Sequence, residues 1–327
     1  MDISSLEGII PILLTPLTED GELDKPGLRH LVEFCVSKGL HGVVLLGSNG
    51  EFPYLSFEEK RSVMSEAALA AAGRIPVIAT ASAFGTDEAV ALACEARAAG
   101  CDAVMAALPL YFKLDFKGVL RHFEAIASEG GLPVIFYYFP EVTGLVLKPE
   151  ELGRIAAIEG VSGAKLTVVN RPFLRKAIAE TRAHGWKVFT GTSFLLKDCL
   201  EFGGSGVFCP LPLIAPDDVK GIYEAYRAGD MGRAGELQTK VRRALPLFSG
   251  MDIYPGLQSL GFQLLSRMPY RGPGQRSPTR HHLLKEALRI QGHPVTNKVK
   301  RPFEKVSDAQ SEFIRRTLDS LGCLNPE

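Results

Sequence analysis

The runs Val43-Val44-Leu45-Leu46 and Val134-Ile135-Phe136-Tyr137 are apolar at nearly every position. Each run is too short for a helix, and neither alternates apolar with polar residues as a strand exposed on one face does. Continuous apolar strands are typical of parallel sheets, because the helices that connect parallel strands cover both faces of the sheet. The two runs therefore favour an α/β fold with a parallel sheet.

Short apolar runs of this kind are each followed by a longer segment of helical period. The predicted strands are Gly8–Pro16, Gly42–Gly47, Pro76–Ala81, Ala103–Pro109, Pro133–Phe139, Val161–Thr167, Lys187–Thr192 and Ser205–Pro210. The predicted helices are residues 25–38, 56–72, 86–99, 115–128, 148–158, 172–184, 194–202 and 216–228. A glycine repeatedly ends a predicted helix before the next strand, as in Lys38-Gly39 and Ala99-Gly100. This pattern is typical of repeated βα units.

Eight strand-helix units within about 220 residues predict a closed (β/α)8 barrel, a TIM barrel, over residues 1–228. An open doubly wound sheet is the alternative, but no Gly-x-Gly-x-x-Gly follows the first strand. Helical patterns continue at 231–245, 282–291 and 308–321, while the basic, proline- and glycine-rich stretch Pro269–Pro278 predicts an exposed loop. We therefore expect residues 229–327 to form a C-terminal helical extension packed on the barrel.

Composition excludes several classes of protein. Of the 327 residues, 46% are hydrophobic and 23% charged, which is typical of a globular protein with a large core. The 37 lysines and arginines balance 37 aspartates and glutamates, so we expect no nucleic-acid partner and no attraction to an anionic membrane. No apolar run approaches the roughly 18 residues that span a bilayer. Met1–Glu7 has neither secretory-signal nor transit-peptide features, which predicts a cytoplasmic protein.

Cysteine and histidine spacing gives no sign of a metal or redox centre. The six cysteines contain no Cys-x-x-Cys pair, and the seven histidines contain no His-x-His or His-x-x-x-His pair. Those pairs are the usual signatures of zinc sites and redox dithiols. We therefore expect buried free thiols, no metal and no cofactor.

Lys165 is the one charged residue well inside a predicted strand, in Val161-Ser162-Gly163-Ala164-Lys165-Leu166-Thr167. Burying an ammonium is costly unless it is paired or its pKa falls, and a neutral lysine amine can attack a carbonyl to form a Schiff base. A lysine whose head reaches the barrel mouth or pairs with a carboxylate is the alternative. In a barrel of this class the chemistry lies at the carboxyl ends of the strands, where Lys165 is expected.

Two further features lie at predicted strand ends. Tyr137 closes the preceding strand, and a phenol beside an imine can transfer protons, although a tyrosine there can also be core packing. The turn Gly47-Ser48-Asn49-Gly50-Glu51 follows the second strand, and its amides and the Ser48 hydroxyl can hold a small carboxylate. Taken alone, this turn is also an ordinary strand-to-helix connection.

Together these features resemble one family, the pyruvate-dependent class I aldolases and lyases that include dihydrodipicolinate synthase and N-acetylneuraminate lyase. The turn Gly47–Glu51 resembles the family's Gly-Thr/Ser-x-Gly-Glu turn, and Tyr137-x-x-Pro140-x-x-Thr143-Gly144 resembles its tyrosine motif. Gly163-Ala164-Lys165 falls where the family has Gly-x-Lys. The resemblance covers roughly residues 8–247 and resumes near 286–302.

The resemblance implies a role for each motif residue. Lys165 would form an imine with the ketone of pyruvate or another 2-oxo acid, Tyr137 would shuttle the proton, and Ser48 would hydrogen-bond Tyr137. The amides of Ser48 and Asn49 would bind the substrate carboxylate. Other implied residues are Tyr111, the position at which some relatives supply a second tyrosine across a dimer interface, and the substrate-binding positions Thr143, Gly191 and Phe208. No metal is needed, because the protonated imine acts as the electron sink.

Residues that differ from the family's pattern restrict the range of possible substrates. Val142 stands where dihydrodipicolinate synthases carry an arginine for the second substrate's carboxylate, so condensation with aspartate semialdehyde would need another basic residue, such as Arg171 or one from the late loop. Gly191 is followed by Thr192-Ser193-Phe194 rather than the acidic pair of sialic-acid lyases. Residues 248–284 depart from the family in length and sequence.

We therefore expect a metal-independent lyase that reversibly releases or condenses pyruvate. The turn motif through Leu55 is closest to 4-hydroxy-2-oxoglutarate aldolases, and the strand of Lys165 is compatible with enzymes of 2-keto-3-deoxy sugar acids. Dihydrodipicolinate synthase activity, N-acetylneuraminate lyase activity and a ligand-binding protein without turnover are the alternatives. Relatives of this kind usually form dimers or tetramers, so we expect a homo-oligomer.

Overall fold

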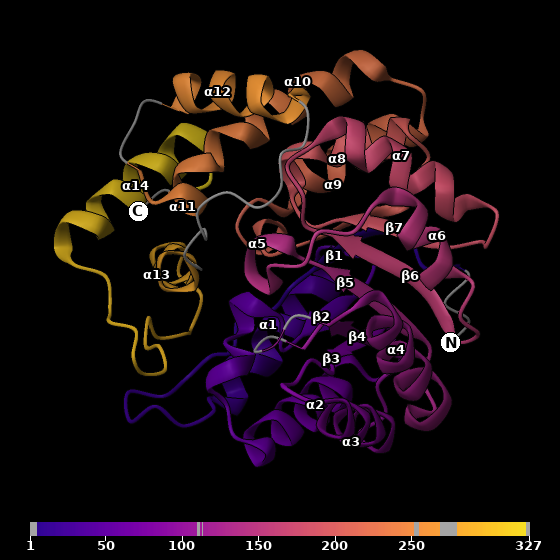
Figure 1. Cartoon of the computed structure of the whole chain (residues 1–327). Coiled ribbons are helices and arrows are strands. Elements are labelled where there is room, and N and C mark those ends of the chain that lie inside the picture. Colours follow the sequence, from indigo (N-terminus) through magenta and orange to yellow (C-terminus); the bar gives the residue numbers. More distant parts are fainter. Residues whose placement is uncertain (1–4, 110–111, 113, 252–254, 269–279, 325–327) are drawn as a thin grey trace.

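The computed structural model describes residues 5–109, 112, 114–251, 255–268 and 280–324. Eight parallel strands form a barrel that helices surround (Figure 1), so the predicted (β/α)8 fold is confirmed. The strands are β1 (Gly8–Pro11), β2 (Val43–Leu45), β3 (Val77–Thr80), β4 (Ala103–Ala107), β5 (Val134–Tyr138), β6 (Val161–Leu166), β7 (Lys187–Thr190) and β8 (Gly206–Cys209). Hydrogen bonds run in the order β1-β8-β7-β6-β5-β4-β3-β2, and the bond from Leu13 N to Val44 O, 2.9 Å, joins the two ends.

Helices follow the strands, and most of them cover the outside of the barrel. They are α1 (Lys25–Ser37), α2 (Phe57–Ala71), α3 (Thr86–Ala98), α4 (Phe116–Gly130), α5 (Pro140–Thr143), α6 (Pro149–Ala156), α7 (Arg171–Arg182), α8 (Leu196–Glu201) and α9 (Pro216–Arg227). Local chemistry sets their starts: at α2 the Ser56 hydroxyl accepts from Glu59 N at 3.2 Å, and the Glu59 carboxylate accepts from Ser56 N at 2.8 Å. This reciprocal cap satisfies two amides that the helix itself leaves without partners.

Side chains of each strand alternate between two apolar layers. On β2, Val43 and Leu45 pack with the surrounding helices, whereas Val44 points into the barrel. The barrel interior is filled by side chains that include Ile10, Ile78, Met105, Ile135, Phe189 and Phe208. Because both faces of every strand are buried, the strands read as continuous apolar runs in the sequence.

The C-terminal extension contains α10 (Met231–Val241), α11 (Leu245–Ser249), α12 (Pro255–Arg267), α13 (His281–Ile290) and α14 (Asp308–Leu321). These orange to yellow helices lie along one side of the barrel (Figure 1). Hydrogen bonds attach them to it: Thr296 Oγ1 donates to Leu17 O at 2.7 Å, and Asn170 Nδ2 donates to Met268 O at 2.7 Å. Among the described residues, no helix is both long and apolar enough to cross a membrane.

Several boundaries differ from the prediction. The first strand ends at Pro11 rather than Pro16, because the chain leaves the sheet once Ile12 has bridged to Val44. The predicted helix 194–202 is divided into a 3-10 turn, Ser193–Leu195, and α8. Three short or late helices, α5, α11 and α12, were not predicted. The predicted loop Pro269–Pro278 lies outside the described residues.

Candidate active site

Lys165 and Tyr137 meet at the carboxyl end of the barrel. They are register partners on the neighbouring strands β6 and β5. The Lys165 Nζ lies 3.8 Å from the centroid of the Tyr137 ring, and both residues are at most 3% exposed. In the part of the chain that the structure describes, no carboxylate forms an ion pair with Lys165. A lysine paired with a carboxylate is one alternative to a Schiff-base lysine that the sequence allows. That pairing is not observed among the described residues.

The turn after β2 brings Ser48 to the same place. Its Oγ lies 3.3 Å from the Tyr137 hydroxyl, within hydrogen-bonding distance. The turn fits only because its glycines lack side chains: a Cβ at Gly47 would lie 2.6 Å from Cγ2 of Ile12, and one at Gly50 would lie 3.1 Å from the Leu13 carbonyl oxygen. The backbone amides of the turn can thus approach a ligand closely.

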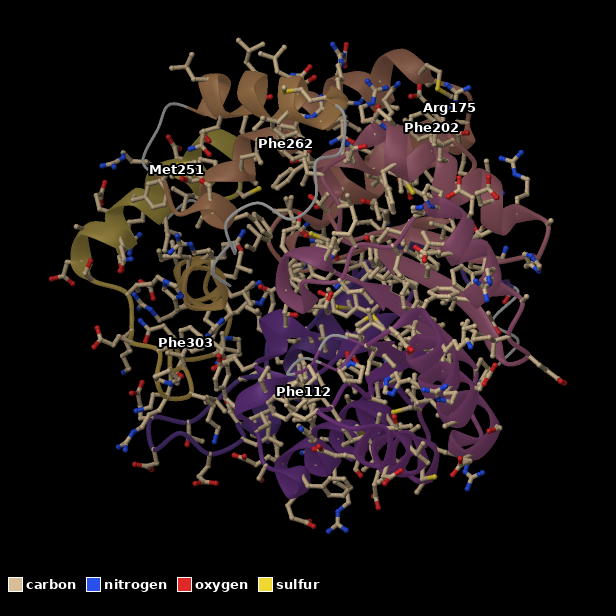
Figure 2. All side chains as sticks on the ribbon, in the orientation of Figure 1. Phe112, Arg175, Phe202, Met251, Phe262 and Phe303 are labelled. Atoms are coloured by element: carbon tan, nitrogen blue, oxygen red, sulfur yellow. The ribbon has the colours of Figure 1, made fainter. Side chains whose placement is uncertain are left out.

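A cavity of about 320 Å³ opens above these residues. Its residues come from the strand ends and from the C-terminal extension: Ile12, Ser48, Asn49, Tyr137, Phe139, Glu141, Lys165, Thr167, Val169, Gly191, Thr192, Phe194, Cys209, Pro210, Leu245, Phe248, Ser249, Phe262 and Arg280. Phe194 packs edge to face on both Phe248 and Phe262, at centroid distances of 5.2 and 5.7 Å. Phe262 belongs to α12 (Figure 2), so the extension completes one wall of the cavity.

The predicted substrate contacts separate into two groups. Gly191 lines the cavity, and a Cβ there would lie 2.0 Å from Thr167 Oγ1, so the position requires glycine. Thr143 and Phe208 are not among the cavity residues: the Thr143 hydroxyl donates to the Phe139 carbonyl at 3.2 Å, and Phe208 stacks on Phe189 inside the barrel, 4.2 Å between centroids. Tyr111 lies outside the described residues.

Three buried polar atoms that belong to residues of this cavity lack hydrogen-bond partners among the described residues. They are Oε2 of Glu141, Oγ1 of Thr167 and Nε of Arg280. Burial also raises the pKa of Glu141, although its own backbone amide opposes the shift. Buried polar groups are nearly always paired, so these three atoms have hydrogen-bonding capacity that the described residues leave unused.

Sequence reasoning did not single out these three residues. Glu141 and Thr167 could have been found, because Glu141 follows the motif proline and Thr167 closes the strand of Lys165. For Arg280 the sequence indicated only that a basic residue from the late part of the chain could bind the second substrate, and Phe262 gave no signal, because their chain segment has no motif and no fixed spacing from the barrel strands.

A buried ion pair lies behind the turn. The Glu51 carboxylate is fully buried, and its Oε1 is 2.5 Å from Nζ of Lys285 on α13. Glu51 Oε2 accepts from the Lys300 backbone amide at 2.7 Å, and Lys285 also donates to the Lys298 carbonyl at 2.6 Å. Burial lowers the pKa of Lys285 although Glu51 opposes that shift. The extension is thereby fastened to the turn that carries Ser48.

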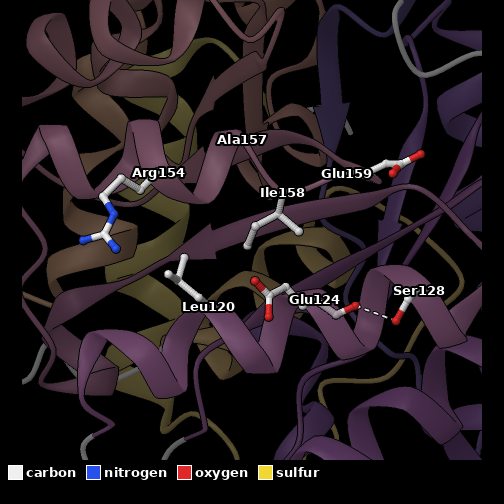
Figure 3. A pocket seen from close by; sticks show the side chains of 7 residues that line it. All are labelled: Leu120, Glu124, Ser128, Arg154, Ala157, Ile158 and Glu159. Carbon is white, nitrogen blue, oxygen red and sulfur yellow. Dashed lines mark hydrogen bonds between the residues drawn. The ribbon is translucent and has the colours of Figure 1, made fainter.

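A larger hollow of about 560 Å³ lies between α4 and α6 on the outside of the barrel (Figure 3). It is lined by Leu120, Glu124, Ser128, Arg154, Ala157, Ile158 and Glu159. The Ser128 hydroxyl already donates to the Glu124 carbonyl at 2.7 Å, and no strand end or motif residue reaches the hollow. Chemistry in this fold occurs at the carboxyl ends of strands, so the smaller cavity above Lys165 is the candidate active site.

Comparison with known proteins agrees with this location. A model of the dihydrodipicolinate synthetase family matches residues 5–253. A 4-hydroxy-tetrahydrodipicolinate synthase of Maridesulfovibrio salexigens is 37% identical over 239 residues, 73% of this chain and 81% of the relative. An Escherichia coli protein named probable 2-dehydro-3-deoxy-D-pentonate aldolase is 34% identical over 242 residues, 73% of this chain and 80% of the relative.

Solved structures extend the similarity to nearly the whole chain. YagE, a prophage protein of the dihydrodipicolinic acid synthase family from Escherichia coli K12 in complex with pyruvate, has a TM-score of 0.86 at 27% identity, covering 98% of this chain and 99% of YagE. A monomeric dihydrodipicolinate synthase variant shares the fold at 23% identity, with a TM-score of 0.83 over 99% of this chain and all of the variant. The family match over most of the sequence, together with these relatives, shows that the chain belongs to the dihydrodipicolinate synthetase family.

Proposed function

We propose that this protein is a metal-independent lyase that releases or condenses pyruvate through an imine on Lys165. The observation that carries the proposal is the position of the Lys165 amine, buried at the floor of the cavity and 3.8 Å from the Tyr137 ring centroid. An amine in this setting can attack the ketone of a 2-oxo acid. The Ser48 and Asn49 amides would bind the C1 carboxylate of that acid.

Tyr137 can account for each proton in the cleavage direction. The Lys165 amine adds to C2, and Tyr137 gives its proton to the departing hydroxyl, which leaves as water and produces a protonated imine and a phenolate. The phenolate takes the C4 hydroxyl proton as the C3–C4 bond breaks, its electrons pass to the imine nitrogen, and an aldehyde leaves. Tyr137 then protonates C3 of the enamine, and water releases pyruvate while returning a proton to the phenolate. The hydrogen bond to Ser48 would hold the phenol in place throughout.

For the substrate, we favour a 4-hydroxy-2-oxoglutarate or a 2-keto-3-deoxy sugar acid. The turn sequence and the similarity to a protein named as a pentonate aldolase support this type. Dihydrodipicolinate synthase activity is the second candidate, because several relatives bear that name, although Val142 replaces the arginine expected for it. Condensation of pyruvate with aspartate semialdehyde, compared with cleavage of the two favoured substrates, separates these candidates.

Borohydride trapping tests the proposal. Incubating the protein with pyruvate and borohydride should add the mass of a reduced pyruvate imine to the peptide that contains Lys165, as measured by mass spectrometry. Lys165→Ala should lose both the adduct and the activity, whereas Lys176→Ala, at an exposed position of α7, should keep them. An unmodified Lys165, or full activity in Lys165→Ala, would overturn the proposal. Tight binding of 2-oxo acids with no turnover would favour a binding protein instead.

A further inference from the structure

Arg280 comes from the C-terminal extension and lines the cavity above Lys165. It immediately precedes α13, and its Nη2 donates to the Ser249 carbonyl at 3.3 Å. Its Nε is buried without a hydrogen-bond partner, and no carboxylate within the described ranges forms an ion pair with the guanidinium. Arg280 is half-buried, and its charge is neither paired with a carboxylate of the described residues nor fully solvated by water, so an anion bound in the cavity could pair with it.

Arg171, the other arginine considered for this part of the barrel, is already engaged. Its Nη2 lies 2.7 Å from Oδ1 of Asp198, and it lines a different hollow, whose other residues come mainly from α8, α10 and α12. Asp198 also approaches Arg242, at 3.6 Å. Arg171 is therefore not available to a substrate in the cavity, whereas Arg280 is.

Two features fix the position of Arg280. Gly250 provides the space, because a Cβ there would lie 2.7 Å from the Arg280 Cζ, and its φ of +66° also favours glycine. The ion pair between Lys285 and Glu51 fastens α13 to the turn that carries Ser48. The guanidinium and the turn amides are thus held in one cavity by contacts that do not depend on a ligand, which is the preorganisation that selective binding requires.

The surroundings indicate which ligand group would meet Arg280. Much of the cavity lining is apolar, including Phe194, Phe248 and Phe262, which offer no hydrogen bonds to a polyhydroxylated tail. Glu141 is the acidic side chain among the cavity residues, and burial raises its pKa, which favours the neutral form that does not repel an anion. A carboxylate matches a guanidinium best, through short charge-assisted hydrogen bonds.

The structure assigns Arg280 as the residue that binds a carboxylate at the far end of the second substrate, so that the aldehyde partner is an acid aldehyde. This assignment rests on the proposed pyruvate chemistry at Lys165. Glyoxylate, the partner in a 4-hydroxy-2-oxoglutarate, and aspartate semialdehyde share the required group. Val142 then no longer excludes an acidic partner, because the charge comes from the extension instead of from the tyrosine motif.

The test compares matched aldehydes in the condensation with pyruvate. Glyoxylate and aspartate semialdehyde are the acidic probes, and glycolaldehyde is the neutral counterpart of glyoxylate. Wild-type protein should prefer at least one acidic probe, and that probe identifies the source of the carboxylate. In Arg280→Gln the ratio of kcat/KM for the preferred acid to that for glycolaldehyde should fall about 10- to 100-fold, as expected for a lost charge-assisted hydrogen bond. Arg280→Lys, which keeps the charge, should fall less.

Arg175→Gln is the matched control, because Arg175 is exposed on α7 (Figure 2) and its removal changes the net charge equally. It should keep the wild-type ratio. Borohydride trapping with pyruvate alone is measured in every variant. Failure of trapping in the wild type would overturn the proposed function itself. Normal trapping with a wild-type preference for glycolaldehyde, or an equal loss for acidic and neutral aldehydes in Arg280→Gln, would overturn the role of Arg280.

Discussion

Lys165 and Tyr137 are register partners on adjacent parallel strands, with the Lys165 Nζ 3.8 Å from the centroid of the Tyr137 ring. In a parallel pair, partners at the same level point to the same face, so both side chains reach the barrel mouth together. Ser48 extends this pair through its contact with the Tyr137 hydroxyl at 3.3 Å. A 2-oxo acid bound to Lys165 would therefore be adjacent to a phenol that a third side chain orients.

Removing the Tyr137 hydroxyl should slow proton transfer without preventing substrate binding. We expect Tyr137→Phe to lower kcat about 100-fold or more, the usual contribution of a positioned acid or base, with a small change in KM for pyruvate. Ser48→Ala should lower kcat less, because it removes only the hydrogen bond that orients the phenol. Steady-state kinetics of pyruvate release measure both values.

Tyr138→Phe is the control on the same strand: Tyr138 packs outward and its hydroxyl accepts from Leu147 N at 2.9 Å. Equal kcat values for Tyr137→Phe and Tyr138→Phe would contradict the role of Tyr137.

The barrel and the floor of the site could be predicted from the sequence because both depend on local patterns. Eight buried strands leave eight apolar runs, and a lysine such as Lys165 is conspicuous within one of them. The wall built by Phe262 and Arg280 could not be predicted, because those residues reach the cavity through tertiary packing of the extension. The ion pair of Glu51 and Lys285 could not be predicted either, because the two residues lie far apart in the chain. In addition, neither glutamate nor lysine is normally expected in a core.

The buried pair of Glu51 and Lys285 should contribute strongly to stability when one partner is removed. Lys285→Met leaves the fully buried Glu51 carboxylate without its cation, so we expect a loss of about 3 kcal/mol in the free energy of unfolding. The double variant Glu51→Gln with Lys285→Met should lose less than the sum of the single variants, because no charge is then left unpaired. Denaturant unfolding measures these differences.

An exposed ion pair provides the control for that series. Lys38 and Asp217 approach to 3.0 Å, but their side chains are 36% and 74% exposed. Lys38→Met should therefore cost less than about 1 kcal/mol. A cost for Lys285→Met as small as that for Lys38→Met would show that the buried pair adds no stability.

We also expect Glu51→Gln to raise KM for pyruvate, because Glu51 ends the turn that carries Ser48 and Asn49.

Two exposed apolar faces lead us to expect a homotetramer. Phe84 and Phe112 are 64% and 76% exposed and line one hollow, and on α12 Leu257 and Leu264 are 62% and 57% exposed. Large apolar patches are unusual on monomers, and two different faces suffice for a dimer of dimers. Light scattering at micromolar concentration should give a tetramer, and Phe112→Glu (Figure 2) and Leu264→Glu should each reduce it to dimers. Leu69→Glu, on α2, is the exposed control. A fully active monomer would remove the expected role of Tyr111 across an interface.

Acid should destabilise the fold through two buried histidines, His122 and His281, and the half-buried His293. Burial lowers the pKa of His122 and His293 to about 4 and that of His281 to about 3, from an ordinary value of 6.5. Below that ordinary value the unfolded chain binds protons that the folded protein does not yet bind. Stability is therefore complete above about pH 6.5 and falls as the pH drops toward 4, by up to about 1.4 kcal/mol per pH unit for each histidine.

His281 offers the sharpest test of this pH dependence. Neither of its ring nitrogens has a hydrogen-bond partner within the described residues, and its ring packs edge to face on Phe303 at 4.5 Å. Its Nε2 lies 3.6 Å from the Glu51 carboxylate, which forms an ion pair with His281 only when the ring is protonated. His281→Phe therefore removes a titrating group without breaking a hydrogen bond. Free energies of unfolding measured from pH 7.5 to 4.5 should fall less steeply with decreasing pH in His281→Phe than in the wild type. The two slopes should differ by up to about 1.4 kcal/mol per pH unit, the value for one proton. His184→Gln, at an exposed position after α7, should keep the wild-type slope. If His281→Phe also kept that slope, the imidazole of His281 would have to be protonated alike in the folded and unfolded states, which burial at 1% exposure next to the Lys285 ammonium opposes.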